Sequence, residues 1–171
     1  MELLPIVLRT IHIGAGVLWV GGSALFFFFL EPTMNKLGPD AERFIDEVMN
    51  KRKAPIYFLV SSTLTVIGGA ILYWRDSSGL NIDWITSPGG LAFTVGGIAA
   101  ILGWLGGNLL IPTTVMKLSA VGGQMKAAGG PPSPDLLSRL HALQERLHTI
   151  GLVDLVLLGI AVLGMASARY L

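Results

Sequence analysis

Four long apolar stretches constrain this chain most. Residues 10–30, 54–74 and 84–116 contain no Asp, Glu, Lys or Arg, and residues 147–168 contain just Asp154. A helix needs about 20 apolar residues to cross about 30 Å of hydrocarbon, and each stretch is long enough. Only 13% of the 171 residues are charged, whereas soluble domains carry about 25%. The sequence therefore predicts an all-α integral membrane four-helix bundle, one transmembrane domain spanning residues 1–171.

The expected membrane helices lie near residues 5–30, 54–75, 89–112 and 147–169. Ser133 followed by Pro134 is typical of a helix N-cap with a first-turn proline. From there leucines continue at helical spacing to Leu147, so we expect the fourth helix to run unbroken over 134–169. Residues 122–134 are rich in Gly and Pro and predict a flexible linker, and residues 40–53 are expected to be partly helical.

The basic residues predict an orientation. If all four helices cross, segments 31–53 and 113–146 lie on one side of the membrane, opposite the two termini. The first side carries nine of the twelve Lys and Arg residues. Because basic loops stay cytoplasmic, we expect an N-out/C-out arrangement in the inner (plasma) membrane of a cell.

Charge and cysteine content exclude several functions. The net charge of +1 and the absence of a long basic run argue against a nucleic-acid partner. The chain has no Cys, which excludes disulfides, thiolate metal sites and covalently attached c-type haem.

The third apolar stretch has one face of small residues: Gly96, Ala100, Gly103 and Gly107. In lipid, small residues let helix backbones approach closely. This face predicts close helix packing, either inside the chain or against a membrane protein partner or a second copy of the chain. A flat glycine face also admits a planar cofactor.

A stripe in the first helix carries the candidate site. Arg9, His12, Gly16 and Trp19 follow one another at spacings of three, four and three residues, which places them on one helix face. The stripe suits haem b: His12 as the metal ligand, Gly16 giving room to the porphyrin edge, Arg9 neutralising a propionate and Trp19 lining the pocket. The alternative is that His12 hydrogen-bonds a neighbouring helix and Trp19 merely packs.

A second axial ligand is less evident. His148 is expected near the opposite membrane boundary from His12, too far along the membrane normal to bind the same iron. Met165 lies at a suitable level and is the best remaining candidate. Otherwise the haem is five-coordinate, or a partner subunit supplies the ligand.

Three further ionisable residues are candidates because polar groups are costly in lipid. We interpret His141 and His148, seven residues apart, as interfacial polar residues of a helix extension. Asp154 is expected to form an ion pair with Arg52 or Lys53, and a role in a proton relay is the alternative.

Residues 8–22, LRTIHIGAGVLWVGG, resemble the first helix of a group of bacterial membrane proteins. The group contains HemJ-type protoporphyrinogen oxidase, the copper-resistance D-type domain and the membrane part of cytochrome-linked urate oxidase. For the HemJ type, the resemblance implies haem b held by His12 and a Lys at the start of the third helix. This sequence has no Lys over 89–112.

The residues and the resemblance together predict a b-type haem-binding membrane protein involved in electron transfer. The alternative is a non-catalytic accessory subunit that packs against a larger respiratory or photosynthetic membrane complex.

Overall fold

The computed structural model describes residues 3–171, with the side chains at 39, 40 and 42 excepted. Within this range the secondary structure is helical and contains no strand. Four helical stretches are long and apolar enough to cross a membrane: Leu3–Leu37, Ala54–Asp76, Pro88–Ala127 and Pro134–Tyr170. The chain is therefore a multi-pass membrane protein, its outer surface apolar and facing lipid, and the predicted all-α four-helix fold is confirmed.

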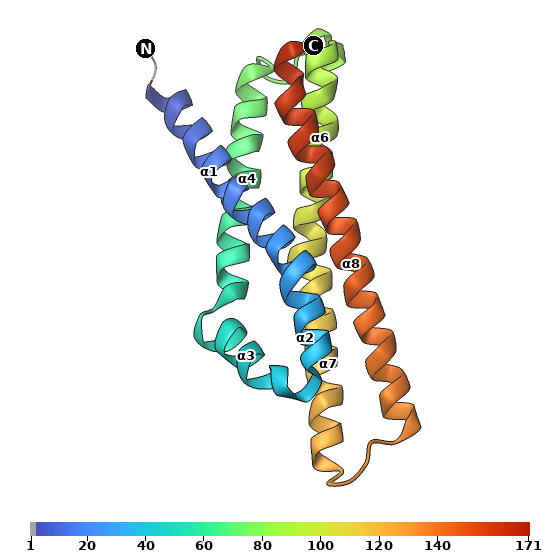
Figure 1. The fold of residues 1–171 in the computed structure, drawn as a ribbon. Coiled ribbons are helices and arrows are strands. Elements are labelled where there is room, and N and C mark those ends of the chain that lie inside the picture. The colour runs from blue at the N-terminus through green and yellow to red at the C-terminus, as the bar shows by residue number, and fades with distance from the viewer. Residues whose placement is uncertain (1–2) are drawn as a thin grey trace.

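Each long stretch is built from shorter elements (Figure 1). The first stretch is α1 (Leu3–Leu25), a π-helical turn (Phe26–Leu30) and α2 (Glu31–Leu37). The second is α4 (Ala54–Asp76), and the third is α6 (Pro88–Leu105), a π-helical turn (Gly106–Leu110) and α7 (Ile111–Ala127). The fourth is α8 (Pro134–Ser167) with a 3₁₀ turn (Ala168–Tyr170). Between them lie α3 (Glu42–Asp46), flanked by a 3₁₀ turn (Gly38–Ala41) and a π-helical turn (Glu47–Lys51), and the short helix α5 (Ile82–Thr86).

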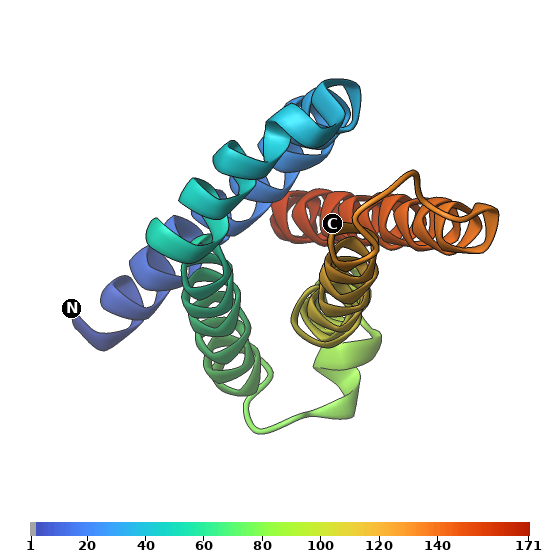
Figure 2. The same cartoon turned by 90° about the horizontal axis from the view of Figure 1, so that it is seen from below.

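The helices associate as two pairs. α1 packs along α4, and α6 with α7 packs along α8, as the end view in Figure 2 shows. The N-terminus and the C-terminus lie at the same end of the bundle (Figure 1), which we call the terminal end. The opposite end holds α3 and the loop between α7 and α8, and we call it the α3 end.

The first and third helices continue beyond their expected ends at residues 30 and 112. Pro32 and Pro112 each fall in the first turn of a new α-helical segment, directly after a π-helical turn. A proline lacks an N–H and clashes with the carbonyl four residues earlier, and the wider π turn accommodates that defect without breaking the helix. As a result α7 runs to Ala127, so the non-helical linker is shorter than expected and begins at residue 128.

The Ser133 cap is confirmed, since its side chain accepts a hydrogen bond from the Leu136 N–H. α8 then runs unbroken through 34 residues. Most of the predicted small-residue face lies against this helix. A Cβ added at Gly96 would sit 3.2 Å from the Ala161 carbonyl oxygen, whereas one at Gly107 would meet nothing within 4 Å. Close packing within the chain therefore uses this face.

Candidate functional site

His12 on α1 packs against a glycine pair on α4, with its Cε1 atom closest to Gly69. A Cβ added at Gly69 would sit 2.8 Å from the His12 Cε1 atom, and one at Gly68 would sit 3.3 Å from the His12 Cβ. No larger residue at position 69 leaves room for the imidazole in this position. The sequence Gly68-Gly69 is thus the reason that the ring fits between the two helices.

One hydrogen bond orients the His12 ring. Its Nδ1 lies 2.8 Å from the backbone carbonyl oxygen of Thr65. A carbonyl oxygen accepts and never donates, so Nδ1 is the protonated nitrogen. In the neutral ring Nε2 then carries the lone pair, and the hydrogen bond of the His12 ring to the described residues is made by Nδ1, not by Nε2. Metal-binding histidines commonly show this arrangement, in which a carbonyl holds one nitrogen and the other remains a ligand.

The other members of the stripe have separate partners. Arg9 forms an ion pair with Asp76 across the α1–α4 interface, at 3.4 Å, with 60% of the arginine side chain exposed. A Cβ added at Gly16 would lie 3.5 Å from the methyl group of Thr65, so Gly16 faces α4. Trp19 is 3% exposed and belongs to the core.

Met165 lies in the other helix pair. A Cβ added at Gly96 would be 3.3 Å from the Met165 Cγ, and Met165 packs on the buried alanine cluster of α6 and α8. His12, by contrast, contacts α4. No contact among the described residues brings Met165 or another candidate ligand to His12. No group of three or more His, Asp or Glu side chains in the described part of the chain is arranged to hold a metal.

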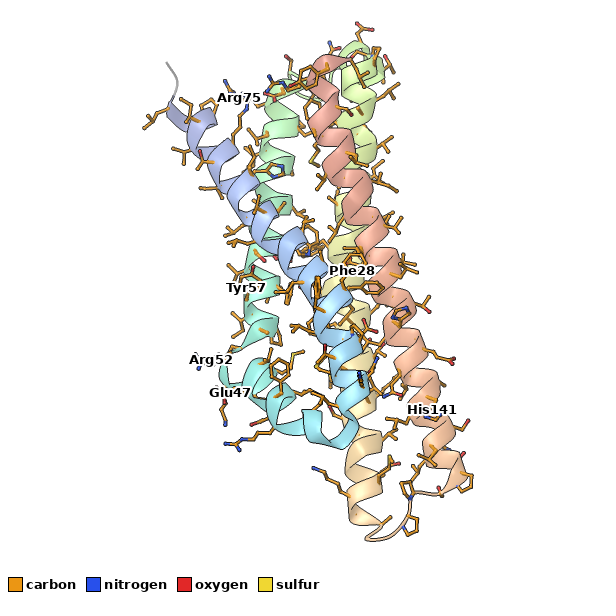
Figure 3. All side chains as sticks on the ribbon, viewed as in Figure 1. Phe28, Glu47, Arg52, Tyr57, Arg75 and His141 are labelled. Carbon is orange, nitrogen blue, oxygen red and sulfur yellow. The ribbon has the colours of Figure 1, made fainter. Side chains whose placement is uncertain are left out.

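The structure adds a pair that the sequence reasoning missed. His148 Nδ1 lies 2.9 Å from Glu31 Oε1, and the imidazole stacks on Phe27 with ring centres 5.0 Å apart. Glu31 is 8% exposed. The signal was available, because Glu31 ends the uncharged first stretch while His148 begins the fourth, and both positions lie at the same end of the bundle. His141, two turns away from His148 on α8, is exposed (Figure 3).

Asp154 forms no ion pair with Arg52, Lys53 or another basic side chain in the described part of the chain, so the expected ion pair is wrong. Arg52 forms an ion pair with Glu47, with 3.1 Å between Arg52 Nε and Glu47 Oε1 (Figure 3). Lys53 is an exposed residue just before α4. Both precede α4, whereas Asp154 faces α6: its Oδ1 would be 3.1 Å from a Cβ at Gly103. Asp154 is 6% exposed, and its Oδ1 is buried without a hydrogen-bond partner among the described residues.

Polar side chains also join the two helix pairs. The Trp104 Nε1–H donates to Thr63 Oγ1 at 3.1 Å, and Asn108 Nδ2 donates to Ser62 Oγ at 3.2 Å. The Ser and Thr residues over 61–65 were the available sequence signal. Sequence reasoning could not assign their partners, because these come from a helix 40 or more residues away.

Comparison of the chain with known protein families, with curated proteins and with solved structures finds no match. The first-helix resemblance described above accordingly remains a prediction from residues 8–22.

Proposed function

We propose that this protein binds haem b in the membrane and takes part in electron transfer, with His12 as an axial ligand. The observation that carries the proposal is the bond between His12 Nδ1 and the Thr65 carbonyl. It fixes the ring orientation through Nδ1 and not through Nε2, the nitrogen that binds iron in such sites. A bound haem would supply the one-electron chemistry, and the protein would supply the ligand and the apolar surroundings.

Arg9 remains available to a haem propionate in this proposal. Its ion pair with Asp76 is long and largely exposed, and such pairs contribute only about 0–1 kcal/mol. A propionate near the terminal end offers Arg9 an equivalent or better charged hydrogen bond. Exchanging one carboxylate for the other therefore costs little.

Met165 serves as the sixth ligand only if it leaves its contact with Gly96. We therefore favour a five-coordinate iron or a ligand from a partner subunit. With basic loops at the α3 end, the positive-inside rule places the His12 end on the outer side of the plasma membrane.

The test is a reduced-minus-oxidised absorption spectrum of the protein purified in mild detergent. We expect Soret and α bands of a b-type haem, and carbon monoxide should shift the reduced Soret band if the sixth position is open. A preparation with no Soret or α band would end the proposal.

The alternative is a non-catalytic accessory subunit of a larger respiratory or photosynthetic membrane complex. The observation that supports this alternative is the outer face of α1, which is open to a partner helix: Cβ atoms at Gly14 and Gly21 would meet nothing within 4 Å. A colourless protein that co-purifies with a large complex, and that separates from it after Gly14→Leu and Gly21→Leu, would favour this alternative. Gly103 is unsuitable for such a test because it packs against Leu158 in the same chain.

A further inference from the structure

Asp154 carries a carboxyl group that is buried between α6 and α8. The residue is 6% exposed, and its Oδ1 has no hydrogen-bond partner among the described residues. A Cβ added at Gly103 would lie 3.1 Å from Asp154 Oδ1 and 3.5 Å from the Leu158 Cδ2. Leu158 follows Asp154 by one turn of α8 and is 1% exposed. The carboxyl group therefore lies between the bare backbone of α6 and an apolar side chain.

Among the described residues, no cation faces Asp154 from the elements packed against α8. These elements are α6, α7, the two π-helical turns at 26–30 and 106–110, α1 and the final 3₁₀ turn. α6 and both π-helical turns contain no ionisable side chain, and Lys117 and Lys126 on α7 are exposed. The ionisable side chains of α1, of the final 3₁₀ turn and of the first turn of the apolar part of α8 contact other groups: Arg9 contacts Asp76, His12 contacts Thr65, Arg169 contacts Tyr170 and His148 contacts Glu31.

The backbone of α6 can accept a hydrogen bond from this carboxyl group but cannot donate one to it. N–H groups inside a helix are used in the hydrogen bonds of the helix itself, whereas each carbonyl oxygen keeps a second lone pair. A protonated carboxyl group has an O–H donor, and a carboxylate has acceptors alone. A carboxylate that lacks both a cation and a donor in apolar surroundings is strongly disfavoured. The surroundings of Asp154 therefore favour the neutral acid.

We propose that Asp154 is a proton-binding site and that local separation of α8 from α6 controls its access to water. When the helices part, a hydronium ion gives a proton to the carboxylate and becomes water, and an O–H bond forms at Oδ1. Closure then returns the neutral acid to its place between Gly103 and Leu158. Loss of the proton follows the same steps in reverse and leaves a charge that opposes closure. This inference does not depend on haem.

The contact with Gly103 couples the proton to helix packing. Because Gly103 has no side chain, the carboxyl group lies against the α6 backbone, whose carbonyl oxygens carry partial negative charge. A neutral acid can donate to such an oxygen, whereas a carboxylate is repelled by it. Helix pairs can open locally at a smaller free-energy cost than global unfolding, so the charge on Asp154 favours the open arrangement.

The test of the proton site is infrared difference spectroscopy of the full-length protein in lipid vesicles, titrated with pH. We expect the carbonyl band of a protonated carboxylic acid and its loss in Asp154→Asn, which is isosteric with the neutral acid and should keep wild-type thermal stability. The matched control is Asp135→Asn on the same helix, because the Asp135 side chain is 69% exposed and pairs with Arg139. This control should keep the band. A wild-type protein without the band, a band that persists in Asp154→Asn, or a marked loss of stability in Asp154→Asn would overturn the proton site.

A pair of glycine variants tests the contact with α6. Gly103→Ala places a methyl group 3.1 Å from Asp154 Oδ1 and should shift the band, because the carboxyl group must move off the backbone. Gly97→Ala on the same helix adds a Cβ that meets nothing within 4 Å, and should leave the band in place. Equal band positions in the two folded variants would overturn the coupling to α6.

Access to water is tested by the rate at which the Asp154 band shifts after transfer to heavy water. Leu158→Ala removes the apolar side chain beside the carboxyl group, and we expect exchange at least about tenfold faster than in wild type because local opening then costs less. Leu163→Ala, which truncates a residue that is 71% exposed, should exchange at the wild-type rate. Wild-type exchange that is complete on mixing, or equal rates in Leu158→Ala and wild type, would overturn the control of access by helix separation.

Discussion

His12 on α1 donates its Nδ1 proton to the backbone carbonyl of Thr65 on α4, at 2.8 Å. The carbonyl belongs to a continuous α-helix, so it accepts this bond in addition to its role in the helix. The contact joins α1 to α4 near the terminal end, where Arg9 and Asp76 also form their ion pair. It does so through a ring that lies on bare backbone at Gly69.

Gly69→Ala should therefore displace the imidazole. The added methyl group would sit 2.8 Å from Cε1, and overpacking of this kind typically costs about 1–3 kcal/mol. The measurement is denaturant or thermal unfolding in detergent. Gly14→Ala is the matched control, since its Cβ meets nothing within 4 Å, and it should leave stability unchanged or raise it by up to about 1 kcal/mol. Equal effects of the two substitutions would contradict the close contact.

Leu158→Ala should destabilise the α6–α8 pair. Leu158 is 1% exposed, and its Cδ2 would lie 3.5 Å from a Cβ at Gly103. Truncating such a side chain leaves a cavity and costs about 2–5 kcal/mol. Leu163→Ala on the same helix removes a side chain that is 71% exposed, and should change stability by no more than about 0.5 kcal/mol. The same unfolding assay checks both, and a similar loss in each would argue against this packing.

The sequence pattern predicted the membrane-spanning helices better than the side-chain contacts between them. The lengths of the apolar stretches predicted the four helices that can cross a membrane, and Ser133 with Pro134 predicted the start of α8. Both signals are local in the sequence. The continuation of α1 through Pro32 depends on a π-helical turn, which leaves no simple periodic pattern. Glu31 lies just past the expected helix end at residue 30, and the continued helix places it beside His148.

The misassigned partner of Asp154 has a different origin. Arg52 and Lys53 were chosen from their level along the membrane normal, and level does not determine which helices are neighbours. α4 pairs with α1 while α8 pairs with α6, so the basic residues before α4 are not directed at Asp154. The His12 stripe was recognised as one face, but the partner of its histidine, a backbone carbonyl, has no sequence signature.

The Trp104–Thr63 hydrogen bond should show a measurable coupling. A double-mutant cycle with Trp104→Phe and Thr63→Val removes the indole N–H and the hydroxyl separately and together. Interhelical hydrogen bonds in membranes contribute about 0.6 kcal/mol on average, with a maximum near about 1.7 kcal/mol, and we expect a coupling energy in that range from unfolding data. A coupling of zero would mean that the 3.1 Å contact does not persist in the membrane.

The orientation is open to direct labelling because the chain has no native cysteine. Asp83 lies on α5 near the terminal end, and Ala128 lies in the loop at the α3 end; both are exposed. A membrane-impermeant thiol reagent added to intact cells should modify Asp83→Cys, and should modify Ala128→Cys only after the membrane is opened. The reverse pattern would place the basic loops outside and contradict the N-out/C-out prediction.

The most direct test of the central claim compares two histidine variants by absorption spectroscopy. His12→Ala should lose the b-type bands in the reduced-minus-oxidised spectrum. His141→Ala, which removes an exposed imidazole at the other end of the bundle, should keep them at wild-type intensity. Bands that survive unchanged in His12→Ala would contradict the assignment of His12 as the haem ligand.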